Sequence, residues 1–456
     1  MKQCIFLIVL SIMLGLLISG CGKAVNPVDD IHKYNPENPQ MAKRPAAEPA
    51  LLPEFEGDKF VKKDVIKRNQ LAGGATVVVD DDGGEDFTTI QDAVDSGAEK
   101  IIIRAGTYAE NVTIPGGSDV TLEGSGVGAT NVTGVAGTNG PIIDVLPGSK
   151  VVIKELTVDG GSAMSGGTDY GIRYEESDGR IKNVEVKNIR NASGSEQGIG
   201  IRVSSSGAKA KVRVEKTIVS NYTRVGIYGN GVGVKLTVKK CDIDGPVLPR
   251  VWAPNGIQIS RGAEAKVRGN EVNNNPSPNP PGGAGSGILL FCAGPTNVKN
   301  NTVRAADLGI ALADNDGAKI LNNDIYDSVF DGISLQFIGL FWGDIGCGVT
   351  PPENNLIKNN DIKDSGDTGV SLVNFDPTTI STTPNNNLII INDIQGSAVE
   401  GIHIWDGADN RIFNNDISGS GSTDSVDDTS GAGTAGTANT WKNNSCSSST
   451  PAGLCK

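Results

Sequence analysis

The stretch "GIHIWDGADNRIFNNDISG", residues 401–419, contains both phrases of a repeat that runs through most of the chain. The first phrase is Gly-aliphatic-x-aliphatic or a close variant, here "GIHI", and the second is apolar-x-Asn-Asn-x-aliphatic, here "IFNNDI". Within each phrase the apolar residues alternate with period two, which is typical of a β-strand with one buried face. Glycine, asparagine and aspartate between the phrases predict tight turns. The stretch therefore predicts one coil of a strand-based repeat.

Both phrases recur at variable spacing. The second returns as "VKNNTV" at 298–303, "ILNNDI" at 320–325, "IKNNDI" at 357–362 and, degraded, "WKNNSC" at 441–446. The glycines of the first phrase are Gly171, Gly200, Gly226, Gly256, Gly287, Gly309, Gly332, Gly369 and Gly401. The shortest spacings, near 22 residues, indicate a minimal coil to which loops are added. Because no coil could bury its apolar face alone, the pattern predicts one elongated solenoid.

These phrases resemble the repeats of right-handed parallel β-helices, the pectate-lyase-like superfamily, over about residues 73–446. The opening stretch, residues 76–114, resembles the N-terminal coil and cap of pectin methylesterases. The resemblance implies an all-β, right-handed parallel β-helix of about 12 coils. Within the opening, "DFTTIQDAV" predicts a short amphipathic helix with Ile90, Ala93 and Val94 on one side. This helix would cap the open end of the first coil.

The second asparagine of each Asn-Asn pair is predicted to be structural. By analogy with the superfamily, the pair forms the bend between the second and third strands of a coil. Amides stacked about 4.8 Å apart can hydrogen-bond along the axis, and asparagine tolerates left-handed backbone angles. The column is Asn270, Asn301, Asn323, Asn360, Asn392, Asn415 and Asn444, preceded by Leu156, Val184, Thr217 and Cys241. We interpret Cys241 as a small buried residue.

The N-terminus predicts export. Lys2 precedes an apolar run from residue 4 to 18, and the following "ISGC" resembles the lipobox of bacterial lipoproteins, in which Cys21 would be acylated. The predicted organisation is a signal peptide (1–20), the lipidated cysteine with a flexible tether (21–72), the β-helix (73–446) and a tail (447–456). The resemblance implies a lipid-anchored protein of the bacterial cell envelope, at the outer membrane or cell surface.

The net charge limits the classes of binding partner, and the cysteine count limits the disulfides. A formal net charge of −13 argues against nucleic acid or an anionic membrane surface as the main partner, so membrane contact is expected only through the lipid anchor. We expect a monomer. In an exported chain, Cys446 and Cys455 could close a C-terminal loop. The remaining cysteines, Cys241, Cys292 and Cys347, cannot all be paired among themselves.

The candidate catalytic residues are His403, Asp331 and Glu400. Enzymes of the superfamily work on the outward face of the first strand, and alternation predicts that His403 is exposed there. Asp331 and Glu400 lie before glycines two coils apart, so their backbones should be about 10 Å apart. That is near the upper end of the roughly 6.5–9.5 Å between the carboxyl groups of inverting glycosidases. The alternative is that both are solvated charges at loop edges.

The candidate substrate-binding residues are aromatic or polar. Alternation places Trp405, Gln258 and Gln336 on the outward face, with Asp406 just beyond Trp405. Long loops that carry Trp252 and Trp342 are expected to flank the outward face of the first strands and so form a groove over it, the first-strand groove. Exposed aromatic side chains suit stacking on sugar rings. Each tryptophan could instead fix only its own loop. These residues are Trp405, Asp406, Trp252, Trp342, Gln258 and Gln336.

No known catalytic motif accompanies these residues. Motifs resembling those of pectin methylesterases, polygalacturonases and alginate epimerases are absent. A copper-maturation β-helix would need His and Met ligands, of which the chain after the signal has two each. We therefore predict no metal site and no cofactor, with Ca²⁺ reserved for the last of three hypotheses.

The leading hypothesis is a surface protein that binds a polysaccharide in the first-strand groove. Whether it also cleaves the polysaccharide, as a hydrolase or lyase, stays open at this point. The second is a non-catalytic adhesion β-helix that meets a cell-surface matrix. The third is a Ca²⁺-dependent polyuronate lyase, which would use residues from the set Asp314, Asp316, Asp331, Arg250 and Arg261.

Overall fold

A computed structural model describes residues 74–135, 140–161, 169–191, 198–246, 253–277, 284–338, 351–375 and 383–455. The chain divides into two units, residues 1–69 and 70–456, and every described residue belongs to the second. The predicted signal peptide, Cys21 and nearly all of the tether lie outside the described residues. Within the described part of the chain, no helix is long and apolar enough to cross a membrane.

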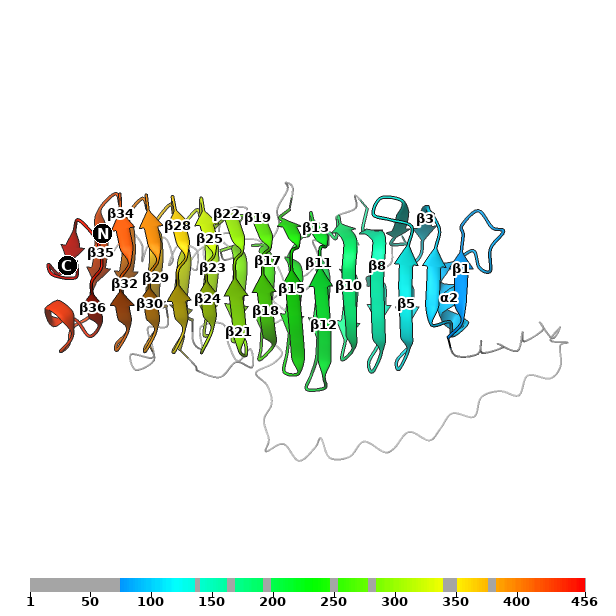
Figure 1. The fold of residues 1–456 in the computed structure, drawn as a ribbon, viewed down its shortest axis with the longest axis horizontal. Helices are drawn as coiled ribbons and strands as arrows, with labels where there is room; N and C mark the ends of the chain where they lie inside the picture. The colour runs from blue at the N-terminus through cyan, green and yellow to red at the C-terminus, as the bar shows by residue number, and fades with distance from the viewer. Residues whose placement is uncertain are drawn as a thin grey trace, which may run out of the picture. The chain divides into compact units, whose positions relative to one another are not determined.

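The second unit is a stack of coils formed by two parallel sheets (Figure 1). The first-phrase strands form the 13-stranded sheet, in which each strand pairs in parallel with that of the next coil. Its strands are β4 (Val112–Ile114), β7 (Pro141–Val145), β9 (Tyr170–Glu175), β11 (Ile199–Ser204), β14 (Val225–Asn230), β17 (Asn255–Ser260), β20 (Ser286–Phe291), β23 (Leu308–Ala313), β26 (Ile333–Phe337), β29 (Thr368–Asn374), β32 (Glu400–Ile404), β35 (Thr423–Asp427) and β37 (Ser449–Thr450).

The other strands form a 24-stranded sheet with two lines of strands. The first line is β1 (Thr76–Val79), β2 (Lys100–Ile103), β5 (Asp119–Gly124), β8 (Lys150–Asp159), β10 (Asp178–Lys187), β12 (Ala210–Glu215), β15 (Val234–Lys239), β18 (Glu264–Arg268), β21 (Thr296–Lys299), β24 (Lys319–Leu321), β27 (Leu356–Lys358), β30 (Leu388–Ile390), β33 (Arg411–Phe413) and β36 (Thr440–Lys442). The second line is β3 (Gly106–Ala109), β6 (Thr130–Thr133), β13 (Ile218–Ser220), β16 (Asp242–Asp244), β19 (Glu271–Asn275), β22 (Thr302–Ala306), β25 (Asp324–Tyr326), β28 (Asp361–Lys363), β31 (Asp393–Gln395) and β34 (Asp416–Ser418). The two long strands β8 and β10 belong to both lines.

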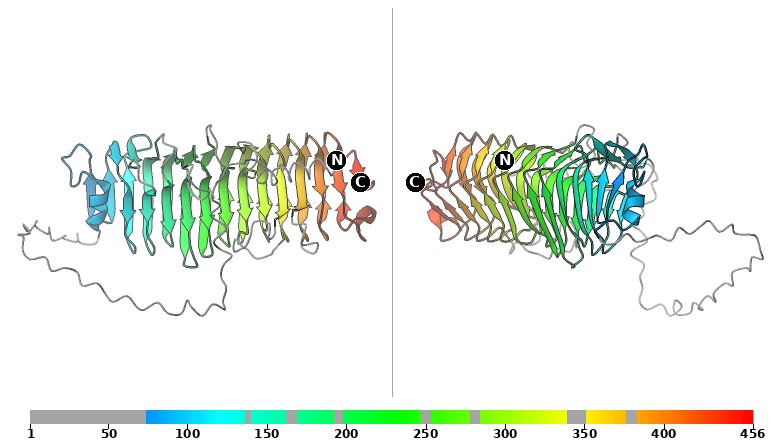
Figure 2. Two further views of the ribbon diagram at one scale, coloured as in Figure 1. Left: turned by 180° about the vertical axis from the view of Figure 1, so that it is seen from behind. Right: turned by 45° about the vertical axis from the view of Figure 1, so that its right-hand side comes forward.

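This architecture confirms the predicted parallel β-helix, and Figure 2 shows the same stacking from two further sides. Inward-pointing aliphatic residues of successive coils form one continuous core. The predicted capping helix is α2 (Ile90–Asp95), which packs on β1, β2 and β4 with Ile90, Ala93 and Val94 buried. Thr89 caps it by accepting a hydrogen bond from the backbone N–H of Asp92. A short 3₁₀ helix, η3 (Thr434–Gly436), lies near the C-terminus.

The predicted asparagine column is confirmed as a buried ladder. Asn323 Nδ2 donates to Asn360 Oδ1 at 3.0 Å, and Asn360 Nδ2 donates to Asn392 Oδ1 at 3.0 Å. The preceding residue of each pair takes a left-handed angle, for example Asn359 with φ 55°. A second ladder was not predicted, and it runs through Asn355, Asn387, Asn410 and Asn439. Its members lie at the ends of loops of unequal length, which hide their common position in the sequence.

The glycine that opens each first phrase is required by close packing between coils. A Cβ on Gly369 would lie 2.6 Å from the carbonyl oxygen of Gly401 and 2.4 Å from a methyl carbon of Ile394. The same approach recurs at Gly309 and Gly332. No other residue fits this position without moving backbone, which is why the phrase begins with glycine.

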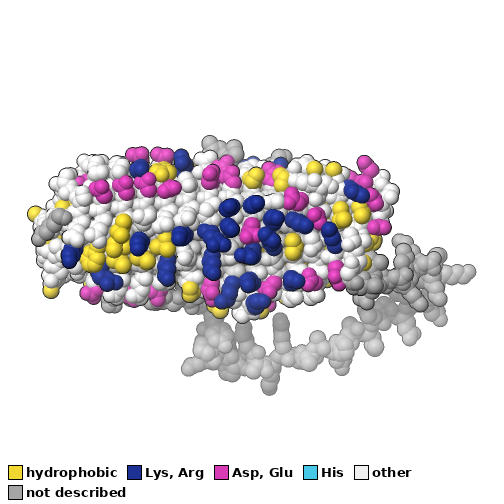
Figure 3. Space-filling view, viewed as in Figure 1, with side chains coloured by type: hydrophobic (Ala, Val, Ile, Leu, Met, Phe, Trp, Pro, Cys, Tyr) yellow, Lys and Arg dark blue, Asp and Glu magenta, His cyan; other side chains and the backbone are white. Residues whose placement is uncertain are grey.

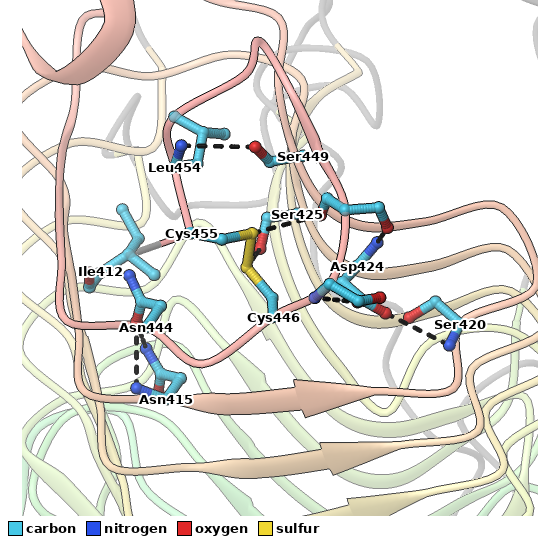
Figure 4. Close-up of a disulfide and its surroundings, with 12 residues drawn as sticks. Ile412, Asn415, Ser420, Asp424, Ser425, Asn444, Cys446, Ser449, Leu454 and Cys455 are labelled. Carbon is cyan, nitrogen blue, oxygen red and sulfur yellow. Dashed lines mark hydrogen bonds between the residues drawn. A yellow bond between two sulfur atoms is a disulfide. The ribbon is translucent and has the colours of Figure 1, made fainter.

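The last coil is closed by the predicted disulfide between Cys446 and Cys455. Figure 4 shows it beside Asn415 and Asn444, the last two members of the predicted ladder. Cys241 is a buried free thiol, as expected, and burial raises the pKa of this thiol to about 11. Cys292 is disulfide-bonded, whereas Cys347 lies outside the described residues.

Candidate functional site

The candidate site lies on the outward face of β26, β29, β32 and β35. Parallel register places Ser334 beside Ser371, Ser371 beside His403, and His403 beside Val426. The neighbouring isoleucines Ile402 and Ile404 are in the core, so His403 points away from it. The sequence-based assignment of this outward column is confirmed by the register.

The predicted exposure of His403 is wrong. Only 5% of its side chain is exposed, because its ring stacks on Trp405 with centroids 3.8 Å apart and an interplanar angle of 19°. Alternation along a strand determines which face a residue takes, but a neighbour two residues later can still cover it. Trp405 is half-buried and uses one ring face for this contact.

Two carboxylates flank the imidazole of His403. Glu400 Oε2 lies 3.7 Å from Nδ1, and Asp428 Oδ2 lies 3.5 Å from Nε2. Glu400 is mostly buried, whereas Asp428 is exposed at the rim. Thr368 Oγ1 donates to Glu400 Oε2 at 3.4 Å from the preceding coil. Neither ring nitrogen of His403 forms a hydrogen bond in the described part of the chain, although each faces a carboxylate oxygen.

The second half of the site is centred on Asp331. Its Oδ2 accepts a hydrogen bond of 2.5 Å from Ser371 Oγ, and the hydroxyls of Ser371 and Ser334 are 2.7 Å apart. Gln336 Nε2 donates to Ser334 Oγ at 3.0 Å, so this predicted binding residue does belong to the cluster. Burial raises the pKa of Asp331 from 3.8 to about 6, although the Ser371 hydrogen bond acts in the opposite direction. Such a carboxyl can carry a proton near neutral pH.

Asp331 and Glu400 lie two strands apart, as predicted. The backbone N–H of Gly332 donates to the carbonyl of Thr368, and Thr368 pairs in register with Glu400. Between them lies Asp367, whose pKa is raised by burial and by the charge of Glu400, and lowered in part by His403. Sequence reasoning missed Asp367, although it stands two residues before a first-phrase glycine.

Several predicted residues lie outside this cluster. Gln258 is on β17, three strands before β26, and hydrogen-bonds Asn255 and Ser260 instead. Asp406 is exposed just after Trp405. Trp252, Trp342 and most of the long loops expected to wall the groove lie outside the described residues.

In the described part of the chain, the acids named for the lyase hypothesis do not belong to any group of three acids close enough to share an ion. Asp314 accepts from the backbone N–H of Ile338, and Asp316 accepts from Asn354, so the two face separate partners. Among the described residues, the one group of three acids close enough to share an ion is Asp80, Asp81 and Asp82 at the other end of the solenoid. Arg261 is half-buried, and Arg250 lies outside the described residues.

Comparison with known families returns two matches. The family described as "Right handed beta helix region" matches residues 141–336, and the family described as "Periplasmic copper-binding protein (NosD)" matches residues 252–453. The described residues do not fit copper, whose ligands in proteins are the imidazole of His and the soft sulfur atoms of Met and Cys thiolate. They include one histidine, His403, one free thiol, Cys241, and no methionine. No curated protein matches the sequence.

Several solved structures are similar to this chain at low sequence identity. "Crystal Structure of the periplasmic alginate epimerase AlgG" is 12% identical with a TM-score of 0.51, over 76% of this chain and 76% of that chain. The "Azotobacter vinelandii Mannuronan C-5 epimerase AlgE6 A-module" is 17% identical with a TM-score of 0.47, over 73% and 94%. The catalytic domain of a GH87 alpha-1,3-glucanase in complex with nigerose is 14% identical with a TM-score of 0.47, over 79% and 64%. The repeat, the register of both sheets and the match to the right-handed β-helix family agree: the chain is a right-handed parallel β-helix protein.

Proposed function

We propose that this protein binds a polysaccharide over β26–β32 and hydrolyses a glycosidic bond there. The observation that carries the proposal is Asp331, a half-buried carboxyl with a pKa raised to about 6 on the outward face. A proton donor to a leaving sugar oxygen needs such a raised pKa. The fold is also shared by the alginate epimerase and glucanase structures, whose names refer to polysaccharides.

Each residue has a distinct role in this proposal. Asp331 donates the proton, and its hydrogen bond from Ser371 holds the carboxyl in place. Glu400 is the base that activates water, and its backbone lies two strand spacings, about 10 Å, from that of Asp331. His403 is too buried to contact substrate, so it acts as a positioning residue for Glu400 and supports Trp405. The partly exposed indole of Trp405 offers an edge against a sugar ring.

We also propose that the protein is exported and held at the bacterial cell envelope through acylated Cys21. The apolar run and "ISGC" at residues 4–21 support this location. The words "periplasmic" in the copper-binding family and in the epimerase title agree with a place outside the cytoplasm.

Because residues 70–456 form a compact unit, the test uses this fragment with a panel of neutral and acidic polysaccharides. Reducing ends should appear, and Asp331→Asn or Glu400→Gln should remove them, whereas Asp393→Asn on β31 should not. Activity should fall as pH rises above about 6, because Asp331 must be protonated. Release of reducing ends that survives Asp331→Asn refutes the assignment. Binding without turnover that is lost in Trp405→Ala supports the non-catalytic adhesion protein instead.

A further inference from the structure

The net charge of the chain conceals a basic face. Figure 3 shows Lys and Arg side chains gathered over the middle strands of the 24-stranded sheet, on a protein whose formal charge is −13. These side chains point outward from β12, β15, β18, β21 and β24, because their neighbours along each strand are in the core. The half-exposed or exposed members are Lys211, Arg213, Lys235, Lys239, Lys266, Arg268, Lys299 and Lys319, of which Lys235 is paired with Glu264.

Three of these cations form a row along the solenoid axis. Lys239 pairs in register with Arg268, and Arg268 pairs with Lys299, so successive charges are about one strand spacing, 4.8 Å, apart. Together with Lys240 they line a hollow of about 300 Å³ that contains no acidic side chain. Of the neighbouring acids, Glu215 is in register with Lys239 and is bound by Arg180, whereas the exposed pair Asp242 and Glu271 lies beyond the turn.

The turn beside this hollow contains a lysine in a strained backbone conformation. Lys240 has a left-handed φ of 53°, at the position that later coils fill with Gly269, Asn300 and Asn322. Glycine and asparagine take this conformation with less strain than lysine. No ion pair joins Lys239, Lys240, Arg268 or Lys299 to an acid in the described part of the chain.

We propose that this hollow binds an acidic polysaccharide that runs along the solenoid axis. A regular row of cations at a constant spacing suits an extended polymer with a carboxylate or sulfate on its sugar units. Single-stranded nucleic acid is disfavoured, because no aromatic residue lines the hollow to stack a base. A flat anionic membrane is disfavoured too, because it would also meet the acidic column Asp324, Asp361 and Asp393 beyond the turn.

This inference deepens the proposed function, on which its polysaccharide class rests, by making that polysaccharide anionic. The two are separable, since Lys239 and Arg268 are on a different sheet from Asp331 and His403. The hollow would hold the polymer at a second contact, away from Asp331 and Glu400.

The test measures the affinity of the 70–456 fragment for tetragalacturonate, with neutral maltotetraose as the comparison. The double variant Lys239→Glu/Arg268→Glu should raise the Kd at least about tenfold, because each charge-assisted contact contributes several-fold to affinity. The charge-matched variant Arg411→Glu/Lys442→Glu should change it less than about twofold, since these exposed residues lie too far along the axis for the same short oligomer. Added salt should weaken binding.

Three results would overturn the inference. The first is equal weakening of binding by the two double variants, which would make it an effect of net charge alone. The second is maltotetraose binding as tight as that of tetragalacturonate. The third is tighter binding of vesicles with anionic lipid or of single-stranded DNA. Tetragalacturonate affinity that depends on Lys239 and Arg268 in a protein that cleaves nothing would retain this inference and reject only the hydrolase.

Discussion

Replacing Asp331 by asparagine should stabilise the protein at neutral pH and not at acid pH. Its pKa rises from 3.8 to about 6 on folding, chiefly because the carboxyl is desolvated. A carboxyl with a raised pKa favours the folded state when it is protonated, so its ionisation costs stability as pH rises from about 4 to about 6. The neutral amide of asparagine has no such ionisation.

The magnitude follows from the two pKa values. The rise from 3.8 to about 6 corresponds to about 3 kcal/mol of lost stability above pH 6. Asparagine also weakens the hydrogen bond from Ser371, which costs about 1 kcal/mol at every pH. Asp331→Asn should therefore gain about 2 kcal/mol at pH 8 and lose about 1 kcal/mol at pH 3.5.

Urea denaturation of the 70–456 fragment and the variant, at pH values from 3.5 to 8, measures this difference. The control variant is Asp364→Asn, which makes the same change of net charge at an exposed residue of a neighbouring coil. The difference in the free energy of unfolding between Asp331→Asn and the parent should change with pH. A difference that stays constant would refute the claim that the Asp331 carboxyl is desolvated on folding. So would a loss of stability at pH 8, and either result would also remove the basis for Asp331 as proton donor.

Three further changes test the solenoid itself. Asn360→Ala removes four buried hydrogen bonds and should cost about 3–5 kcal/mol in urea denaturation, whereas Asn359→Ala in the exposed turn should cost about 1 kcal/mol; equal losses would contradict the ladder. Cys446→Ser opens a loop with a sequence separation of 9 and should destabilise the last coil by about 2–3 kcal/mol. Hydrogen exchange should then accelerate in residues 440–455 alone, and acceleration throughout would show that the disulfide supports the whole stack. Gly369→Ala brings a methyl group 2.6 Å from the carbonyl oxygen of Gly401 and should lower the melting temperature by several degrees; an unchanged value would mean that the coils can separate locally.

The fold could be predicted because its determinants are local and repeated. Alternation of apolar residues gave the face of each strand, and the asparagine column followed from one position in a recurring phrase, as Asn323 and Asn360 show. Even the helix that covers the first coil was readable, since Ile90 and Val94 are four positions apart on one face. Features that rest on loops of unequal length, such as the ladder through Asn387 and Asn410, were not readable.

Only part of the candidate site could be predicted from the sequence, because alternation along a strand is local whereas burial depends on contacts with other residues. The outward direction of His403 follows from alternation, but its burial depends on Trp405 folding back over the ring, which the period of a strand does not encode. Asp367 belongs to the site because stacking of the coils places it near Glu400 and His403, and no sequence motif marks it.

By itself, the sequence determined a parallel β-helix, because each coil repeats the same strand and turn chemistry. It also placed Asp331 and Glu400 two coils apart. Tertiary structure alone decided how charge is distributed: residues about 30 positions apart, such as Lys239, Arg268 and Lys299, become neighbours only when coils stack. A total charge of −13 sums over all faces, whereas a ligand meets only one of them.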